Sequence, residues 1–523
     1  MTAERPTKLA PAGTDDAGLA TLAQPGSLLE RMAHGAAWVV GWRMARRLVG
    51  LVSTLILVRL LVPADFGLVA LGYGFVGALD ALSAAGVEQA IIRDDKPDRA
   101  LYDTGFTVNL LRALGMAAVL AAGAGTIAGF LGDPRLYGIV LAFAAMTALT
   151  GVTNIGILDF QRYIAFDKEF VLKIVPRLLS VTITILAAVI WRSYWALVAG
   201  IVSTNLSGVV FSYWMHPYRP RLTLRGWRRL VRFSLWMWVL GLINTLRGQA
   251  PNLIVGRLAG AASVGILSVG SEVASLPSTE LIEPLSRASF AGFAAARRSD
   301  QNGAKAFLRM IAAMALIVFP AGVGISLVAD PVVRLAFGPA WMQAVPLIEV
   351  LGVAGTMTLF GSISGTVFAA HAWMRPMAKI NAVTTTACLL LLAVLVPRFG
   401  ILGAVVAIAI TDALNQGIYL VVTLRRLGLR LTELLARVWR SLAGTVVMAF
   451  VLVRLGLGWT AFSGAGFTLA GHLLGAVALG AGIYFAVLAG AWLMSGRPDG
   501  AESDLLALAQ RIADSLTLRR RRA

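Results

Sequence analysis

Apolar segments of about 20 residues recur along almost the whole chain, and they constrain its fold more than any other feature. Each segment is long enough to cross a bilayer as a helix, and the stretches between segments are too short to fold as separate soluble domains. Of the 523 residues, 58% are hydrophobic and only 14% are charged. The sequence therefore predicts an all-α polytopic membrane protein with about fourteen transmembrane helices.

The predicted spans fall into two parallel six-helix bundles followed by two extra helices. A connector rich in arginine, HPYRPRLTLRGWRR, separates the two bundles. The predicted boundaries are 1–30 for a flexible cytoplasmic tail, 31–216 for the N-terminal bundle, 217–231 for the basic cytoplasmic connector, 232–424 for the C-terminal bundle, 425–495 for helices 13 and 14, and 496–523 for a basic cytoplasmic tail.

Lysine and arginine gather in alternate loops, and this asymmetry predicts the orientation of the chain. The connector carries Arg219, Arg221, Arg225, Arg228 and Arg229, whereas each loop on the opposite side carries at most one basic residue. Because the cytoplasmic side keeps the excess of positive charge, both termini are predicted to be cytoplasmic. The net charge of +19 is then a topology signal and a match to anionic lipid headgroups, and no nucleic-acid partner is expected.

Two parts of the chain show internal similarity. VRLLVPADFGLVALG aligns with GRLAGAASVGILSVG, which pairs Arg59 with Arg257 and Gly67 with Gly265 at an offset of 198 residues. An even number of spans separates the two segments, so the repeat is parallel and its pseudo-two-fold axis follows the membrane normal. Transporters of this kind place the substrate site between their repeats. We therefore expect a central cavity lined by predicted spans 1, 2, 7 and 8, near 36–61, 66–91, 232–256 and 264–290.

Basic and polar side chains within the spans are the candidate substrate-binding residues, because each arginine in a helix centre costs roughly 2.5–3.5 kcal/mol on insertion. In span 1 the spacing puts them on one helical face, and span 7 repeats such a face. A cavity-facing position is favoured; interhelical ion pairs and snorkelling to the surface remain as alternatives. The predicted cavity residues are Arg43, Arg46, Arg47, Asn244 and Arg247, with Arg112 and Arg177 either extending the lining or lying near a cytoplasmic edge.

Acidic and amide side chains in other spans allow two interpretations. One is ion coupling, to protons or sodium, or contact with sugar hydroxyls; the other is pairing with the arginines. These residues are Asp80, Glu272, Asp412, Asn415 and Gln416.

Signatures of catalytic, nucleotide and metal sites are missing from the sequence. GYGFVG at 72–77 resembles a phosphate-binding loop but lies in an apolar span and follows no strand, so we interpret it as a helix-packing patch. The four histidines are widely separated, which gives a metal site little support. Asp65 and Asp133 suit turns or helix caps. We expect no enzyme activity and no cofactor, with energy from an ion gradient or the membrane potential.

Three segments of this chain resemble a known transporter family. They are GAAW, the following LVRLLVPADFG, and RLAGAASVG in the second half. Over roughly 30–490 the chain resembles the polysaccharide flippases, Wzx-like and colanic-acid-exporter-like, of the multidrug/oligosaccharidyl-lipid/polysaccharide exporter superfamily.

The resemblance implies a flippase that moves undecaprenyl-diphosphate-linked oligosaccharide repeat units from the inner to the outer leaflet by alternating access. The place would be the bacterial cytoplasmic (inner) membrane, and the purpose exopolysaccharide, capsule or O-antigen biosynthesis. The implied partners are the undecaprenyl-diphosphate-linked glycan, membrane lipids, and the polysaccharide polymerase with its chain-length machinery.

Other classes of protein remain as alternatives. A peptidoglycan lipid-precursor flippase of the same superfamily has a similar number of spans and also has cavity arginines. A multidrug/cation antiporter usually has fewer spans and a cavity led by carboxylates. A membrane glycosyltransferase or polymerase usually needs a long outer loop, whereas the outer loops of this chain are short.

Overall fold

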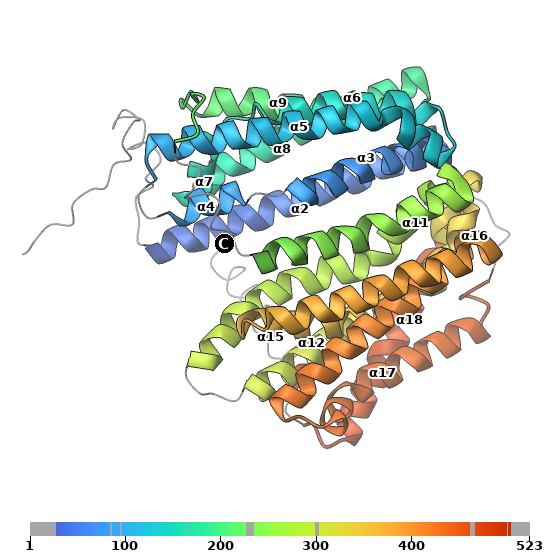
Figure 1. The fold of residues 1–523 in the computed structure, drawn as a ribbon. Helices are drawn as coiled ribbons and strands as arrows, with labels where there is room; N and C mark the ends of the chain where they lie inside the picture. The colour runs from blue at the N-terminus through green and yellow to red at the C-terminus, as the bar shows by residue number, and fades with distance from the viewer. Residues whose placement is uncertain are drawn as a thin grey trace, which may run out of the picture. The chain divides into compact units, whose positions relative to one another are not determined.

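The computed structural model describes residues 28–83, 86–94, 97–163, 165–225, 235–298, 303–460, 466–498 and 500–503. Within these ranges the chain forms helices, turns and loops, with no strand (Figure 1). Nine of the described helices are long and apolar enough to cross a membrane. Two bent helix pairs pass the same test, and counting each pair as one span gives up to eleven spans in the described part of the chain. The predicted all-α polytopic membrane protein is confirmed, while the number of fourteen spans stays a prediction.

The chain divides into two compact units, one ending at Gly265 and one beginning at Ile266. The predicted bundle, connector and tail boundaries stay predictions. Unit 1 contains α2 (Leu28–Leu60), α3 (Pro63–Ser83), α4 (Val87–Arg93), α5 (Arg99–Leu131), α6 (Arg135–Thr150), η1 (Ile155–Ile157), α7 (Leu158–Arg162), α8 (Phe166–Trp191), α9 (Trp195–Met215) and the first part of α11 (Leu235–Arg298).

Helix α5 shows how local sequence sets the ends of a span. Asp98 precedes it, and the Asp98 side chain accepts a hydrogen bond of 3.1 Å from the backbone N–H of Leu101, which satisfies a donor that the first turn leaves open. Gly132 ends the helix with a φ of 73°, a left-handed conformation that glycine adopts without steric cost. The 33 residues between these caps give a helix of about 50 Å.

Unit 1 packs consecutive helices together and also brings together helices that are distant in the sequence. Helix α5 packs against α6, α8 packs against α9, and α2 packs against α8. Near the beginning of α5, a core of Val87, Ile91, Leu101 and Phe106 joins α4 and α5. Helix α2, which carries Arg46 and Arg47, is thereby placed next to α8, which carries Arg177.

The glycines of α3 serve close helix packing. A β-carbon on Gly72 would lie 2.7 Å from a methyl carbon of Ile139, and one on Gly67 would lie 1.7 Å from the carbonyl oxygen of Ala261. Reciprocally, a β-carbon on Gly265 would lie 1.8 Å from the carbonyl oxygen of Pro63. The packing interpretation of GYGFVG is confirmed at Gly72. The two glycines that the 198-residue offset aligns, Gly67 and Gly265, allow backbone contact between α3 and the first part of α11.

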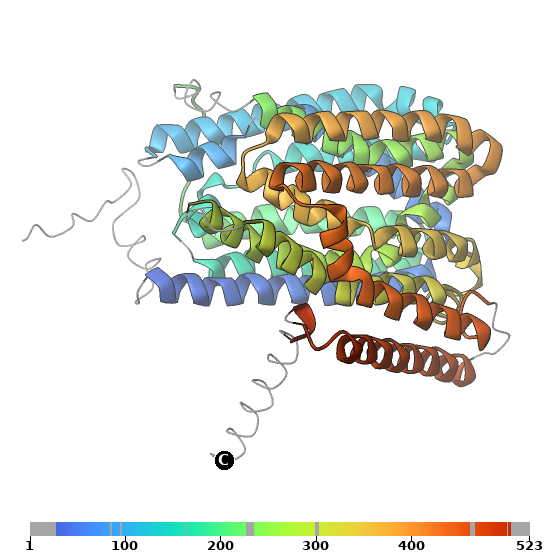
Figure 2. The same ribbon diagram turned by 90° about the horizontal axis from the view of Figure 1, so that it is seen from below.

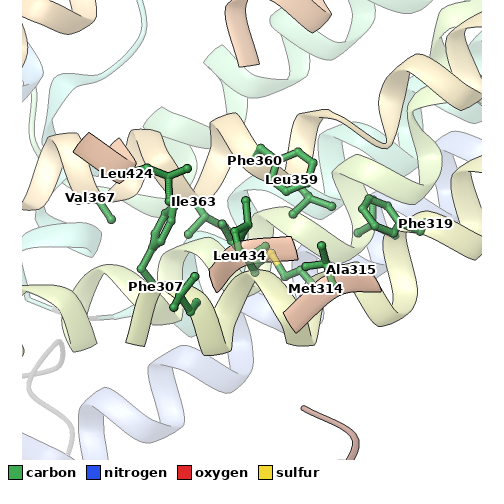
Figure 3. Close-up of a cluster of buried hydrophobic side chains, with 14 residues drawn as sticks. Phe307, Met314, Ala315, Phe319, Leu359, Phe360, Ile363, Val367, Leu424 and Leu434 are labelled. Carbon is green, nitrogen blue, oxygen red and sulfur yellow. The ribbon is translucent and has the colours of Figure 1, made fainter. Parts of the chain in front are cut away.

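Unit 2 contains the rest of α11, then α12 (Gly303–Leu327), α13 (Ala329–Ala336), η2 (Pro339–Ala344), α14 (Val345–Gly355), α15 (Thr358–Ala370), α16 (Met374–Leu427), α17 (Leu431–Arg454) and α18 (Phe467–Met494). A buried cluster around Phe307, Phe360 and Leu434 joins α12, α15 and α17 (Figure 3). Helix α18 runs beside α17 (Figure 2).

Helix α16 is a hairpin of two arms. Its 54 residues would extend about 81 Å as one straight helix, far more than the roughly 30 Å hydrocarbon core of a bilayer. The backbone breaks at Gly400, where φ is 58°. The arms meet again through Asn415, whose Nδ2 donates to Oγ1 of Thr384 at 2.7 Å. A polar contact between residues 31 apart in sequence requires that the arms lie side by side.

Candidate functional site

The basic face of α2 lies at the interface between α2 and α8. Arg46 and Arg47 are located one helical turn before Gly50. A β-carbon on Gly50 would lie 3.6 Å from Nη2 of Arg177 on α8. Because Gly50 has no side chain, the guanidinium of Arg177 can lie close to the backbone of α2.

Burial differs among these arginines. Arg46 is exposed, Arg47 and Arg177 are half-buried, and Nε and Nη2 of Arg47 and Nε of Arg177 are shielded from solvent. Residues three apart on a helix share a face, so Arg47 and Gly50 lie on the same side of α2. The structure therefore brings Arg47 and Arg177 to one interface. The side chain of Arg43 lies outside the described residues.

Two guanidinium groups on adjoining helices form an arrangement suited to an anion. Each guanidinium stays charged at any physiological pH and presents a planar set of donors that matches the oxygen atoms of phosphate. Low polarity around the helices strengthens such contacts relative to water. This interface is the candidate site for a phosphorylated ligand.

Arg112 has a different environment, at the interface between α3 and α5. Its Nη1 donates to Oδ1 of Asp80 at 2.6 Å and lies 3.5 Å from Oγ of Ser83. Asp80, named as a candidate for ion coupling, thus pairs with an arginine, as the alternative interpretation expects. The part of either residue in a cavity lining stays a prediction.

The polar residues of the seventh predicted span lie in the first part of α11. Asn244 is exposed and Arg247 is half-buried. Their neighbour Gln249 packs on α3, with its Oε1 3.4 Å from where a β-carbon on Gly74 would lie. That Asn244 and Arg247 face the arginines of α2 across a cavity stays a prediction.

The predicted coupling or sugar-contact residues of unit 2 divide into two groups. Glu272 is exposed and Asp412 is half-buried. Asn415, by contrast, is buried and bonds to Thr384 and Asn381 in the other arm of α16, at 2.7 and 3.3 Å. Gln416 lies so close to α15 that a β-carbon on Gly361 would be 1.4 Å from its Oε1. Asn415 and Gln416 therefore serve the packing of unit 2; whether they also act in transport is untested.

Asp65 and Asp133 have the cap and turn functions that the sequence predicts. Asp65 accepts hydrogen bonds of 3.2 Å from the backbone N–H groups of Val62 and Tyr194. Asp133 accepts from the backbone N–H of Arg135 at 3.0 Å, and the side-chain hydrogen bond from Arg135 holds the pKa of Asp133 below its usual range. Among the described residues, no group of three or more His, Cys, Asp or Glu side chains is arranged to hold a metal ion.

Comparison with known proteins identifies the family. A family model described as polysaccharide biosynthesis protein matches residues 56–346, more than half of the chain. This chain belongs to the polysaccharide biosynthesis protein family. The matched region begins within α2 and ends within α14, so it includes α8 and the first part of α11.

Curated relatives of this polysaccharide biosynthesis protein are similar over much of their length. The lipopolysaccharide biosynthesis protein WzxC of Escherichia coli is 24% identical over 371 residues, covering 69% of this chain and 74% of WzxC. The succinoglycan biosynthesis transport protein ExoT of Rhizobium meliloti is 24% identical over 321 residues, covering 60% of this chain and 65% of ExoT. The chain thus spans about two thirds to three quarters of these relatives.

Solved structures show the same fold at low sequence identity. The lipid II flippase MurJ in an inward closed conformation matches with a TM-score of 0.70 and 11% identity, covering 88% of this chain and 100% of that one. An inward-facing transporter of the multidrug resistance MATE family matches with a TM-score of 0.59 and 15% identity, covering 73% and 94%. This chain therefore shares its helical fold with these proteins.

Proposed function

We propose that this chain is a flippase that moves undecaprenyl-diphosphate-linked oligosaccharide units from the inner to the outer leaflet of a bacterial cytoplasmic membrane. The product would supply a cell-surface polysaccharide, and both termini would be cytoplasmic. Membership of the polysaccharide biosynthesis protein family supports the substrate class. The observation that carries the proposal is the basic interface between α2 and α8, formed by Arg47 and Arg177 beside Gly50.

The chemistry of the substrate explains why this interface is basic. A lipid diphosphate that leaves the headgroup region loses hydration, and an unpaired anion in hydrocarbon is very costly. Arginines held on rigid helices replace part of that hydration by bidentate hydrogen bonds to phosphate oxygens. In this proposal Arg46 and Arg47 bind the diphosphate together with Arg177, and Arg247 and Asn244 contribute from α11.

The driving force would come from outside the chain. An anion that moves outward gains up to about 2.3 kcal/mol per charge for each 100 mV of membrane potential. Glu272 and Asp412 are the acidic residues proposed for coupling to protons or sodium, because their side chains lie in membrane-length helices and are exposed and half-buried, respectively. The polysaccharide polymerase and chain-length machinery are proposed to receive the flipped unit.

The proposal is tested by measuring surface polysaccharide in cells that carry single alanine variants of Arg46, Arg47, Arg177 and Arg247. At equal membrane levels we expect R47A and R177A to lower export strongly, with undecaprenyl-linked repeat units accumulating inside. Arg398→Ala serves as the control, since Arg398 is exposed and located near the break in α16. Wild-type export in all four variants would overturn the basic-site proposal; loss of growth with normal surface polymer would indicate a peptidoglycan-precursor flippase instead.

A further inference from the structure

The segment 216–225, called the strap here, follows α9 and is fixed to the rest of unit 1 by its backbone. Nδ2 of Asn154 donates to the carbonyl oxygens of His216 and Tyr218, at 3.3 and 2.8 Å. The backbone N–H of Arg221 donates to Oδ1 of Asp103 at 2.8 Å, and that of Thr223 donates to Oγ1 of Thr107 at 3.0 Å. The strap is therefore an ordered part of unit 1.

Buried ionisable side chains of the strap bond to carboxylates elsewhere in unit 1. Oη of Tyr218 donates to Asp103, and Nε2 of His216 lies 3.3 Å from Oδ2 of Asp159. Nδ1 of His216 accepts the backbone N–H of Tyr218 at 3.2 Å, so the ring proton is on Nε2, where it can reach Asp159. Burial, reinforced by the hydrogen bond to Asp103, raises the pKa of Tyr218, so its hydroxyl stays protonated and donates. These charge-assisted contacts hold the strap in one conformation.

The strap runs alongside the first turns of α5. Arg221 of the strap bonds to Asp103 of α5, and Thr223, two residues later in the strap, bonds to Thr107, four residues later in α5. Four helical residues rise about 6 Å, and two extended residues span about 6–7 Å, so the two segments are parallel. Helix α5 is about 50 Å long against a hydrocarbon core of roughly 30 Å, and its first turns carry the charged residues Arg99 and Asp103 whereas its last turns are apolar, so its beginning extends to headgroup level. The strap therefore descends through the headgroup region toward the acyl chains.

The exposed residues of the strap combine positive charge with aliphatic groups. Leu222 and Leu224 are 71% and 48% exposed. Arg221 and Arg225 are exposed, and within the described part of the chain neither guanidinium has a carboxylate partner. Arginine with leucine at this depth is typical of segments that bind a charged membrane surface.

We infer that the exposed surface of the strap, formed by Arg221, Leu222, Leu224 and Arg225, is a binding site for an anionic phospholipid. The two guanidinium groups bind the phosphate of the headgroup, and the two leucines insert beside the first acyl carbons. The anchored backbone prepares this arrangement in advance, which lowers the entropy lost on binding. The site is separate from the proposed transport site, and it holds a resident lipid of the leaflet in which the beginning of α5 lies.

Counting bound lipids on the purified full-length protein by native mass spectrometry tests this inference. The protein is delipidated and mixed with phosphatidylglycerol or, separately, with phosphatidylcholine. We expect R221Q/R225Q to lower phosphatidylglycerol occupancy about tenfold, because two charge-assisted contacts are lost, and to leave phosphatidylcholine occupancy unchanged. The matched control is R398Q/R454Q, which removes the same charge from two exposed arginines of unit 2 and should retain wild-type occupancy.

A second variant separates charge from insertion. L222Q/L224Q keeps both arginines and should lower phosphatidylglycerol occupancy about threefold, through loss of the aliphatic contact. Equal thermal unfolding temperatures would show that both double variants fold. The site is overturned if R221Q/R225Q binds as much phosphatidylglycerol as the wild-type protein, or if R398Q/R454Q loses as much. Insertion of the leucines is overturned if L222Q/L224Q has no effect.

Discussion

In unit 1, an arginine lies between α3 and α5 and another lies between α2 and α8, and the two have different neighbours. Between α3 and α5, Arg112 meets Asp80 at 2.6 Å, so opposite charges on neighbouring helices neutralise each other. Between α2 and α8, Arg177 lies over Gly50, one turn from another arginine, Arg47, and nitrogen atoms of both are shielded from solvent. The first interface contains an ion pair between two helices, and the second brings guanidinium groups from two helices together.

This difference shows what decides the use of an arginine in a membrane helix. The insertion cost of the residue is similar in both places, but Arg112 meets a carboxylate on the neighbouring helix, whereas Arg177 brings a second guanidinium to the side of α2 that carries Arg47. The contact of Arg112 with Asp80 stabilises packing between helices, whereas two guanidinium groups at one interface favour an anionic ligand. The comparison predicts that variants at the two interfaces will differ in export more than in stability.

The largest effect is expected at the interface between α2 and α8. Replacing Arg47 and Arg177 together by alanine should lower polysaccharide export by roughly a hundredfold or more, since each lost charge-assisted contact contributes about 1.5–3 kcal/mol. Export is measured as surface polymer per cell at matched membrane levels. Export within twofold of wild type would show that like charge at this interface has no part in transport.

An intermediate effect is expected from a change that moves Arg177 without removing its charge. Leucine at Gly50 should lower export about tenfold, because its side chain must displace a guanidinium that lies 3.6 Å from the β-carbon position. Alanine at Gly50 makes only ordinary van der Waals contact and should be tolerated. The control is Gly125→Leu on α5, where a β-carbon meets nothing within 4 Å. Equal export from G50L and G125L would contradict the assigned position of Arg177.

The smallest effect is expected at the interface between α3 and α5. The Asp80 side chain is 59% exposed, so its pair with Arg112 should contribute less than about 1 kcal/mol to the free energy of unfolding. A double-mutant cycle of D80N and R112Q, followed by thermal or denaturant unfolding in detergent, measures this coupling. All three variants should retain most of their export. A severe export defect in R112Q that D80N does not relieve would move Arg112 into the transport site.

The sequence predicted those features that depend on local pattern. Apolar length alone identifies a polytopic helical protein, because a lipid environment requires backbone hydrogen bonds to close within each segment. Helical spacing placed Arg46 and Arg47 one turn before Gly50, and the apolar context of GYGFVG indicated packing, which the contact of Gly72 with Ile139 bears out. Turn chemistry correctly predicted the hydrogen bonding of Asp65 and Asp133.

Contacts between distant segments could not be predicted from the local sequence pattern. Asn415 was predicted as a candidate contact for ion or sugar, and nothing in its spacing reveals a partner in the other arm of α16. The strap was predicted only as a basic connector. Its anchors, Asp103 and Asn154, come from α5 and from the turn before η1, and each is an ordinary polar residue when considered alone. For Asp80, the sequence left open both ion coupling or sugar contact and pairing with an arginine. The spacing of residues on one helix does not reveal which neighbouring helix each residue contacts.

Transport by purified protein in liposomes measures whether Arg47 and Arg177 are needed to move a lipid-linked glycan across a bilayer. Liposomes carry an undecaprenyl-diphosphate-linked oligosaccharide in one leaflet, and its arrival in the other leaflet is followed with an impermeant sugar-modifying enzyme. If Arg47 and Arg177 bind the diphosphate during transport, we expect rapid transfer by the wild-type chain and transfer close to the protein-free rate for R47A/R177A. We expect near wild-type transfer for D80N/R112Q. Equal transfer by all three proteins, or no transfer by the wild-type chain above protein-free liposomes, would contradict these expectations.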